Sequence, residues 1–174
     1  PLEAMLAGID WNWETFPEYL ATVDRLPKAL NYGAYIGHSA LRMYTMGQRA
    51  LSETATADDV ARMVAAVKEA IKAGAMGFSS SRAGTHVTPD DTPVASRIAD
   101  WSEIDALVGA MADLDAGIFQ VGPDVSSGPT QRAFLQRLRQ VALESGRPVM
   151  FGTISTRQGD RPNSYRYQLD YLDD

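Results

Sequence analysis

The stretch TADDVARMVAAVKEAIKAGAMGF, residues 56–78, decides the fold class of this chain. Its apolar residues recur at intervals of three and four positions, which is the spacing of one face of an α-helix. Thr56 and Asp59 have the spacing of a capping box, and Gly74 stands where a left-handed residue would end the helix. The apolar run 75–78 follows and is interpreted as a buried strand. The segment therefore predicts one helix–glycine–strand unit.

The same unit returns along the chain. A helix over 100–114, with Asp100 and Glu103 as its cap and N3 partner, precedes a strand at 118–121. A predicted helix at 16–26 precedes a strand at 30–36, and one at about 130–144 precedes a strand at 148–151. A final helix is predicted at 165–174.

Four predicted strands thus alternate with helices that are long enough to act as crossovers, so we expect the strands to pair in parallel. The strands are short and apolar on both faces, which is typical of sheets covered by helices. The predicted class is α/β with about four strands. No linker divides residues 1–174, which are expected to belong to a single domain.

Composition excludes several classes of function. The chain has 174 residues, a net charge of −6 and a pI near 4.9, and it lacks the basic cluster that a nucleic-acid-binding face needs. No apolar run approaches the roughly 20 residues that span a bilayer, and residues 1–10 do not read as a signal peptide. Cysteine is absent, which excludes a thiolate nucleophile. We therefore expect a cytoplasmic protein with no nucleic-acid or membrane partner.

Polar residues gather where the predicted strands end. Ligands of parallel α/β proteins bind at the carboxyl ends of the strands, so this edge is the candidate site. Both histidines of the chain follow predicted strands. No catalytic residue is assigned, and the candidates for substrate contact are His38, Arg42, Ser80, Arg82, His86, Gln120, Asp124 and Arg157.

The candidates also have structural interpretations. His38 either orients a ligand or is a buried residue that fixes a strand-to-helix turn, since buried polar groups need partners. Arg42 either binds a substrate carboxylate or clamps the neighbouring loop. His86 is either a substrate contact or a solvated loop residue. Asp124 could ligate a metal or accept a proton, and a role in the turn next to Pro123 is the alternative. No base is recognised beside the serines at 79–81, so a serine hydrolase is not expected.

Two longer segments resemble a known family. Residues 11–47, WNWETFPEYLATVDRLPKALNYGAYIGHSALRMYTMG, and residues 68–86, KEAIKAGAMGFSSSRAGTH, are similar to the N-acyl-D-amino-acid deacylases, or D-aminoacylases, of the amidohydrolase superfamily. The resemblance implies a metal-dependent (β/α)8 TIM-type barrel that hydrolyses the amide bond of N-acyl-D-amino acids or similar amides. It also implies a small-molecule substrate and zinc or another divalent metal.

The resemblance further implies that the chain holds about four βα units from the middle of the barrel. A whole barrel takes about 250 residues. The His-x-His pair of the family's first strand has no counterpart here, and the family's catalytic aspartate is expected after residue 174. The strand ends FQVGPD, 119–124, and FGTIST, 151–156, lack the histidines that bind metal in the known deacylases. Either the metal is bound outside this chain, or the metal site is reduced or altered, and no metal ligand is assigned.

The chain alone is therefore expected to be inactive. A second hypothesis, from another class of function, is a non-catalytic binding or self-assembling module. It rests on the two open edges of a four-stranded sheet, which a second copy or the rest of a barrel would cover. A third hypothesis is a complete small doubly wound domain that binds an anion at its strand ends.

Overall fold

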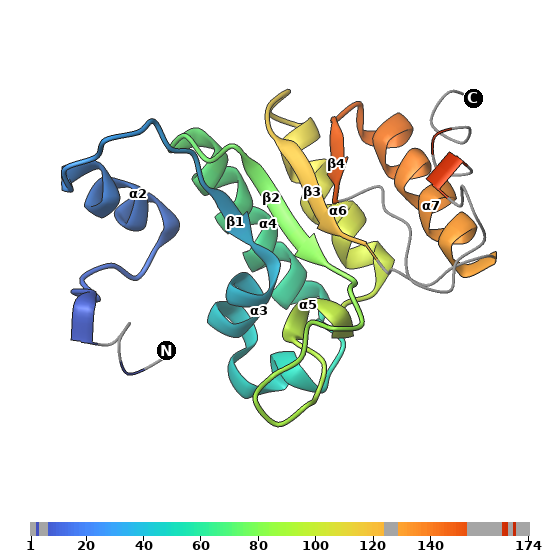
Figure 1. Cartoon of the computed structure of the whole chain (residues 1–174), viewed down its shortest axis with the longest axis horizontal. Helices are drawn as coiled ribbons and strands as arrows, with labels where there is room; N and C mark the ends of the chain where they lie inside the picture. The colour runs from blue at the N-terminus through green and yellow to red at the C-terminus, as the bar shows by residue number, and fades with distance from the viewer. Residues whose placement is uncertain (1–2, 4–6, 124–128, 153–164, 167–168, 170–174) are drawn as a thin grey trace.

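The computed structural model describes residues 7–123 and 129–152, together with residues 3, 165, 166 and 169. It contains a four-stranded sheet in the order β1-β2-β3-β4, and each neighbouring pair of strands is parallel (Figure 1). The predicted α/β class, with parallel strands that alternate with helices, is confirmed. The strands are β1 (Tyr35–Gly37), β2 (Gly77–Ser81), β3 (Ile118–Gly122) and β4 (Val149–Phe151).

Helices join successive strands and cover one face of the sheet. Helices α4 and α6 lie behind the sheet in Figure 1, and α2 lies to one side of it, packed against α4. The long helices are α2 (Phe16–Arg25), α4 (Ala57–Lys72), α6 (Trp101–Ala112) and α7 (Pro129–Ser145). The shorter ones are α3 (His38–Met46), the 3-10 helix η1 (Gly47–Leu51) and α5 (Ala95–Ile98).

Helix α4 forms where its sequence predicts. The Thr56 side chain accepts a hydrogen bond from the backbone N–H of Asp59, and the Asp59 carboxylate accepts one from the Thr56 backbone, which confirms the capping box. Gly74 follows the helix with a φ of 106°, a conformation that favours glycine. Met63 and Val67 are fully buried against the sheet. Local sequence thus sets both the ends and the inward face of α4.

The core lies between the sheet and these helices. Phe78 of β2 and Phe119 of β3 stack with their ring centroids 5.7 Å apart, and both are fully buried. Ile104 and Leu107 of α6 belong to the same buried cluster. The apolar stripes predicted for the helices therefore meet the predicted strands in one core.

The other face of the sheet carries smaller and more polar side chains. Because side chains alternate along a strand, the sequence neighbours of Phe78 and Phe119 point away from the helices. The register pairs Ser79 with Gln120, and both are half-buried. We call this side the open face. At the carboxyl half of the sheet it is formed by Gly37, Ser79, Ser81, Gln120 and Gly122.

Two predicted strands have different limits in the structure. The strand predicted at 30–36 begins only at Tyr35. The first backbone hydrogen bond to the neighbouring segment, from Met76 N–H to Ala34 O at 2.8 Å, forms just before this residue. Leu30 is 82% exposed. The strand predicted at 75–78 instead covers residues 77–81.

The three serines at 79–81 extend β2 because β3 pairs with them. Polar residues are accommodated there since Ser79 and Ser81 face the open side of the sheet, whereas Ser80 finds a buried partner. Helix α5 lies in the segment between β2 and α6.

Helix α3 was not predicted. Its inner residues Leu41 and Met46 are buried, but nine residues are too few to give a clear periodic signal. The helix predicted at 165–174 falls largely outside the described residues. In the part of the chain that the structure describes, no helix is long and apolar enough to cross a membrane.

Candidate functional site

The carboxyl ends of the parallel strands meet at one edge of the sheet. The register places Gly37 beside Ser79 and Ser81 beside Gly122, so β1, β2 and β3 end close together. The candidate residues divide between the helix side and the open face of this edge. Asp124 and Arg157 lie outside the described residues.

His38 occupies a closed position on the helix side. It begins α3 directly after β1 and is 1% exposed. Its Nδ1 lies 2.8 Å from Ser80 Oγ, and its Nε2 lies 2.7 Å from Oε1 of Glu103, a residue 65 positions later in the chain. The ring also meets Phe78 edge-on, with centroids 5.0 Å apart. Both ring nitrogens of His38 are therefore engaged inside the protein.

Arg42, one turn further along α3, provides the positive charge beside Glu103. Its Nη1 donates to Glu103 Oε2, and its Nη2 donates to the carbonyl oxygen of Glu53 at 2.7 Å. Its side chain has no exposed surface. The arginine thus clamps the segment that follows η1 and pairs with a buried carboxylate.

The charges in this cluster are set by burial and hydrogen bonding. Burial by itself would raise the pKa of the Glu103 carboxyl, but hydrogen bonds from His38 and Arg42 outweigh it and hold that pKa below its ordinary value. Burial lowers the pKa of His38, and the neighbouring Glu103 opposes this only in part. The cluster is therefore an Arg42–Glu103 ion pair with a neutral imidazole whose Nε2–H donates to the carboxylate.

The role predicted for Glu103 as a capping partner is wrong. Asp100 is the N-cap residue of α6, but its side chain makes no capping hydrogen bond. Glu103 is 3% exposed and points to α3 instead, because the buried Arg42 guanidinium offers a stronger partner than a backbone amide. The contact joins residues 61 positions apart, so no local pattern announces it.

The position of this cluster favours the structural interpretation of His38 and Arg42. Ser80 points toward the helices, since it alternates with the open-face residues Ser79 and Ser81. The hydrogen bond from Ser80 to His38 therefore ties the end of β2 to α3 beneath the edge of the sheet. The cluster therefore lies on the helix side of the sheet, where it holds the end of β2 and the beginning of α3 in place.

Arg82 also lies on the helix side. Its guanidinium stacks over the Trp101 ring at 5.0 Å and donates to the carbonyl oxygen of Arg97 at 3.3 Å. Burial lowers its pKa, while the charges of Asp100 and Glu103 oppose that change. These contacts join β2 to the beginning of α6.

Ser81 and His86 form a second polar pair, beside the open face. Ser81 Oγ lies 2.5 Å from His86 Nδ1 and accepts a hydrogen bond from the backbone N–H of Ala83 at 3.2 Å. The expectation that the serines have no base beside them is therefore wrong for Ser81. The two residues are five positions apart, so the turn between them was the one available signal.

Gln120 reaches the open face from β3. It pairs in register with Ser79 and lies two residues before Gly122, on the same side of the strand. The part of the open face at this edge thus presents hydroxyl, amide and imidazole groups, all of which can bond to ligand oxygens.

The described residues do not fit a metal centre. Among them, no group of three or more His, Asp and Glu side chains could hold a metal ion. His38 has both ring nitrogens engaged, and His86 has its Nδ1 engaged by Ser81. The described residues therefore do not by themselves form a site for the metal that the resemblance implies.

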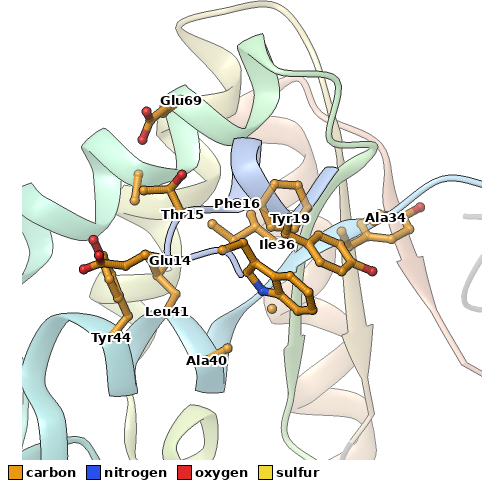
Figure 2. A pocket seen from close by; sticks show the side chains of 14 residues that line it. Glu14, Thr15, Phe16, Tyr19, Ala34, Ile36, Ala40, Leu41, Tyr44 and Glu69 are labelled. Carbon is orange, nitrogen blue, oxygen red and sulfur yellow. The ribbon is translucent and has the colours of Figure 1, made fainter. Parts of the chain in front are cut away.

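A cavity of about 360 Å³ lies beside β1, and its walls include the whole of that strand. Figure 2 shows Phe16 and Tyr19 of α2 close to Ile36 of β1, with Leu41 of α3 and Glu69 of α4 further along its wall. No sequence pattern predicts this cavity, because α2, β1, α3 and α4 all contribute to its walls. It is lined by Trp13, Glu14, Thr15, Phe16, Tyr19, Ala34, Tyr35, Ile36, Gly37, Ala40, Leu41, Tyr44, Ala66 and Glu69.

These features define a class of protein: a parallel α/β fold whose polar groups gather at the carboxyl ends of its strands. Comparison with known families gives the more particular assignment. A family model described as "Amidohydrolase family" matches residues 6–173. The chain belongs to the amidohydrolase family.

Relatives with similar sequences are much longer than this chain. An uncharacterised protein of Mycobacterium tuberculosis is 31% identical over 136 residues, which is 73% of this chain and 22% of the relative. A D-aminoacylase of Alcaligenes xylosoxydans xylosoxydans is 34% identical over 80 residues, or 46% of this chain and 16% of that enzyme. The chain thus spans about a fifth of the length of these relatives.

Solved structures show the same relationship. A D-aminoacylase structure, reported for the functional role of its binuclear metal centre, has a TM-score of 0.63 and 25% identity, covering 78% of this chain and 26% of its own. An N-acyl-D-glutamate deacylase from Bordetella bronchiseptica, complexed with zinc and a phosphonate inhibitor, has a TM-score of 0.76 and 20% identity. It covers 97% of this chain and 33% of its own, and this likeness shows the fold.

Proposed function

We propose that the intact protein hydrolyses the amide bond of N-acyl-D-amino acids or closely similar amides, with residues 1–174 as central βα units of its barrel. The observation that carries the proposal is the likeness to D-aminoacylase, 25% identical over 78% of this chain, inside a family match over residues 6–173. The small share of each relative that this chain covers supports further strands elsewhere in the intact protein.

The proposed substrate site is the carboxyl edge on the open face. His86 and Gln120 are its proposed contacts within the described residues. Asp124 and Arg157 are further proposed contacts, because they follow β3 and β4 in the sequence. The buried groups His38, Arg42, Ser80 and Arg82 are assigned a supporting role, because their polar atoms bond to other parts of the protein.

A divalent metal, zinc by resemblance, is part of the proposal. The D-aminoacylase above is reported with a binuclear metal centre, and the Bordetella bronchiseptica deacylase is complexed with zinc. Since no group of three or more described side chains could hold a metal ion, its ligands are proposed to lie mostly outside residues 1–174.

We further place the protein in the cytoplasm, with a small-molecule substrate and no membrane partner. The acidic balance, a net charge of −6, argues against a nucleic-acid partner.

The test is amide hydrolysis by the intact protein. A panel of N-acetyl-D-amino acids is incubated with the purified protein, and the released amino group is quantified before and after chelation and after zinc is restored. We expect release that chelation abolishes and zinc recovers, and no release by a truncated protein limited to residues 1–174. Release that is insensitive to chelation, or absent from the whole panel after metal loading, contradicts the proposal.

A second candidate, a binding or self-assembling module, is favoured by the arrangement at β1. β1 is an outer strand of the described sheet, and the apolar cavity adjoins it. Exposed strand edges pair readily with further strands. A homo-oligomer seen by light scattering, in a protein whose measured mass equals that of these 174 residues and which hydrolyses no amide, would favour this candidate.

A further inference from the structure

The loop that carries His86 is held in place although the residue itself is exposed. The backbone N–H of His86 donates to the carbonyl oxygen of Ala83 at 3.0 Å, which closes a turn directly after β2. Arg97 of α5 donates from Nη1 to the carbonyl oxygens of Gly84, at 3.2 Å, and of His86, at 3.1 Å. A two-residue antiparallel bridge between Val87 and Pro93 closes the loop on its far side. The backbone of His86 is therefore fixed from three directions.

The imidazole is oriented by Ser81. The Ser81 oxygen accepts the N–H of Ala83, and it lies 2.5 Å from His86 Nδ1. A hydroxyl carries one proton to donate. When Ser81 donates that proton to Nδ1, the neutral imidazole carries its own proton on Nε2, because the second nitrogen determines the tautomer.

The end of β3 leaves room for this pair. A Cβ at Gly122 would lie 3.0 Å from Ser81 Oγ and 3.7 Å from His86 Cε1. The imidazole thus lies near Gly122, with Cε1, the ring atom between Nδ1 and Nε2, on that side. Glycine at this position leaves room for Ser81 Oγ, and His86 lies beside that hydroxyl at the carboxyl edge of the open face, where Gln120 lies two residues earlier on β3.

We propose that the Ser81–His86 pair is a hydrogen-bond donor site, in which Nε2–H of His86 binds an oxygen of the substrate's acyl carbonyl or carboxylate. This inference rests on the proposed function for the identity of the substrate. Ser81 is the positioning residue, since it acts through the imidazole. Arg97 and Gly122 fix the loop and provide the space.

Nuclear magnetic resonance tests the tautomer without any turnover. Long-range ¹H–¹⁵N spectra of the intact protein distinguish a protonated from a bare ring nitrogen, and the His86→Gln variant assigns the signal. We expect a proton on Nε2 of His86 in the unaltered protein and a mixture of tautomers in Ser81→Ala. A proton on Nδ1 in the unaltered protein overturns the proposal.

Ligand binding is then followed through the same signal. Addition of an N-acetyl-D-amino acid is expected to shift the Nε2 resonance. The same compound with its carboxylate capped as an amide, and the free D-amino acid without the acyl group, identify which oxygen is bound. No shift with any of the three compounds, at concentrations that saturate other signals of the protein, overturns the proposal.

Kinetics separate this inference from the proposed function. His86→Ala is expected to raise KM about tenfold, the loss of one hydrogen bond, with a smaller effect on kcat. His86→Gln, which retains a donor, should recover most of that loss. Thr85→Ala, an exposed neighbour in the same loop, is the control and should leave both constants unchanged.

If the protein hydrolyses acyl amino acids and His86→Ala behaves like Thr85→Ala, the donor site is wrong and the function stands. If the protein hydrolyses none of them but the Nε2 signal shifts with ligand, the donor site stands and the function falls.

Discussion

At the scale of the residue, Glu103 is a carboxylate held almost out of contact with water, between an arginine and a neutral histidine. Removing one partner of a buried pair leaves the other charge uncompensated. The stability of the fold should therefore depend on Glu103 far more than on an ion pair at the surface.

Glu103→Gln keeps the shape of the side chain but leaves the Arg42 guanidinium buried without a counter-charge. We expect a loss of about 3 kcal/mol or more in the free energy of unfolding, measured by urea denaturation. The control is Asp113→Asn, which removes the exposed Lys68–Asp113 pair and should cost less than about 1 kcal/mol. Equal losses in the two variants would contradict the charge assignment.

The same cluster predicts how stability depends on pH. The pKa of His38 in the folded protein lies below its ordinary 6.5, and that of Glu103 lies below its ordinary 4.5. Below each ordinary value, and down to the folded pKa, the unfolded chain binds a proton that the folded protein does not. The contribution of these two groups to the free energy of unfolding should therefore be complete above pH 6.5. On acidification the free energy of unfolding should fall, by at most about 1.4 kcal/mol per pH unit for each group.

His38→Gln retains a donor toward Glu103 but cannot titrate. In this variant the loss of stability just below pH 6.5 should disappear, while the loss below 4.5 remains. Urea denaturation across that range measures both parts. An unchanged slope below 6.5 would show that His38 is not the group responsible.

At the scale of the element, the pairing of β2 with β3 depends on Gly77. A Cβ at this position would lie 1.9 Å from the carbonyl oxygen of Ile118, which is a backbone atom and cannot rotate away. Gly77→Ala should therefore lower the free energy of unfolding by at least about 2 kcal/mol.

Gly109→Ala is the matched control for that substitution. A Cβ at Gly109, inside α6, meets no atom within 4 Å, and alanine is the better helix former. This variant should be stabilised by about 0.5–1 kcal/mol in the same denaturation experiment. A Gly77→Ala protein as stable as the unaltered one would mean that β2 and β3 do not approach as described.

Prediction from sequence succeeded where the signal is local. Examples are the apolar stripe and capping box of α4, the position of Gly74 and the apolar runs of the strands. Each of these signals involves residues that are close together in the sequence, so the sequence alone predicts it. Helix α3 was missed because it is short and begins with a histidine at the end of β1.

The site was harder to predict because its contacts join distant positions. Glu103 meets His38 and Arg42 across more than sixty residues, and its spacing from Asp100 imitates a helix cap. The direction in which Ser80 and Ser81 point depends on the limits of β2, which the sequence placed too early. His86 is a candidate on sequence grounds, but its contact with Ser81 depends on the turn at Ala83.

At the scale of the whole molecule, the described residues supply one layer of helices, four parallel strands and an open face with polar side chains at the carboxyl ends of the strands. The amidohydrolase match spans residues 6–173, whereas the relatives extend well beyond the length of this chain. The proposed roles of these residues are therefore substrate contact and support, and the proposed metal ligands lie mostly outside residues 1–174.

The most direct test of this account uses the racemic form of one N-acetyl amino acid. The intact, metal-loaded protein is incubated with the racemate, and the free amino acid is resolved by chiral chromatography. The account predicts release of the D-amino acid with the L-enantiomer left acylated. Preferential release of the L-amino acid, or an intact amide bond in both enantiomers across the panel of side chains, would contradict it.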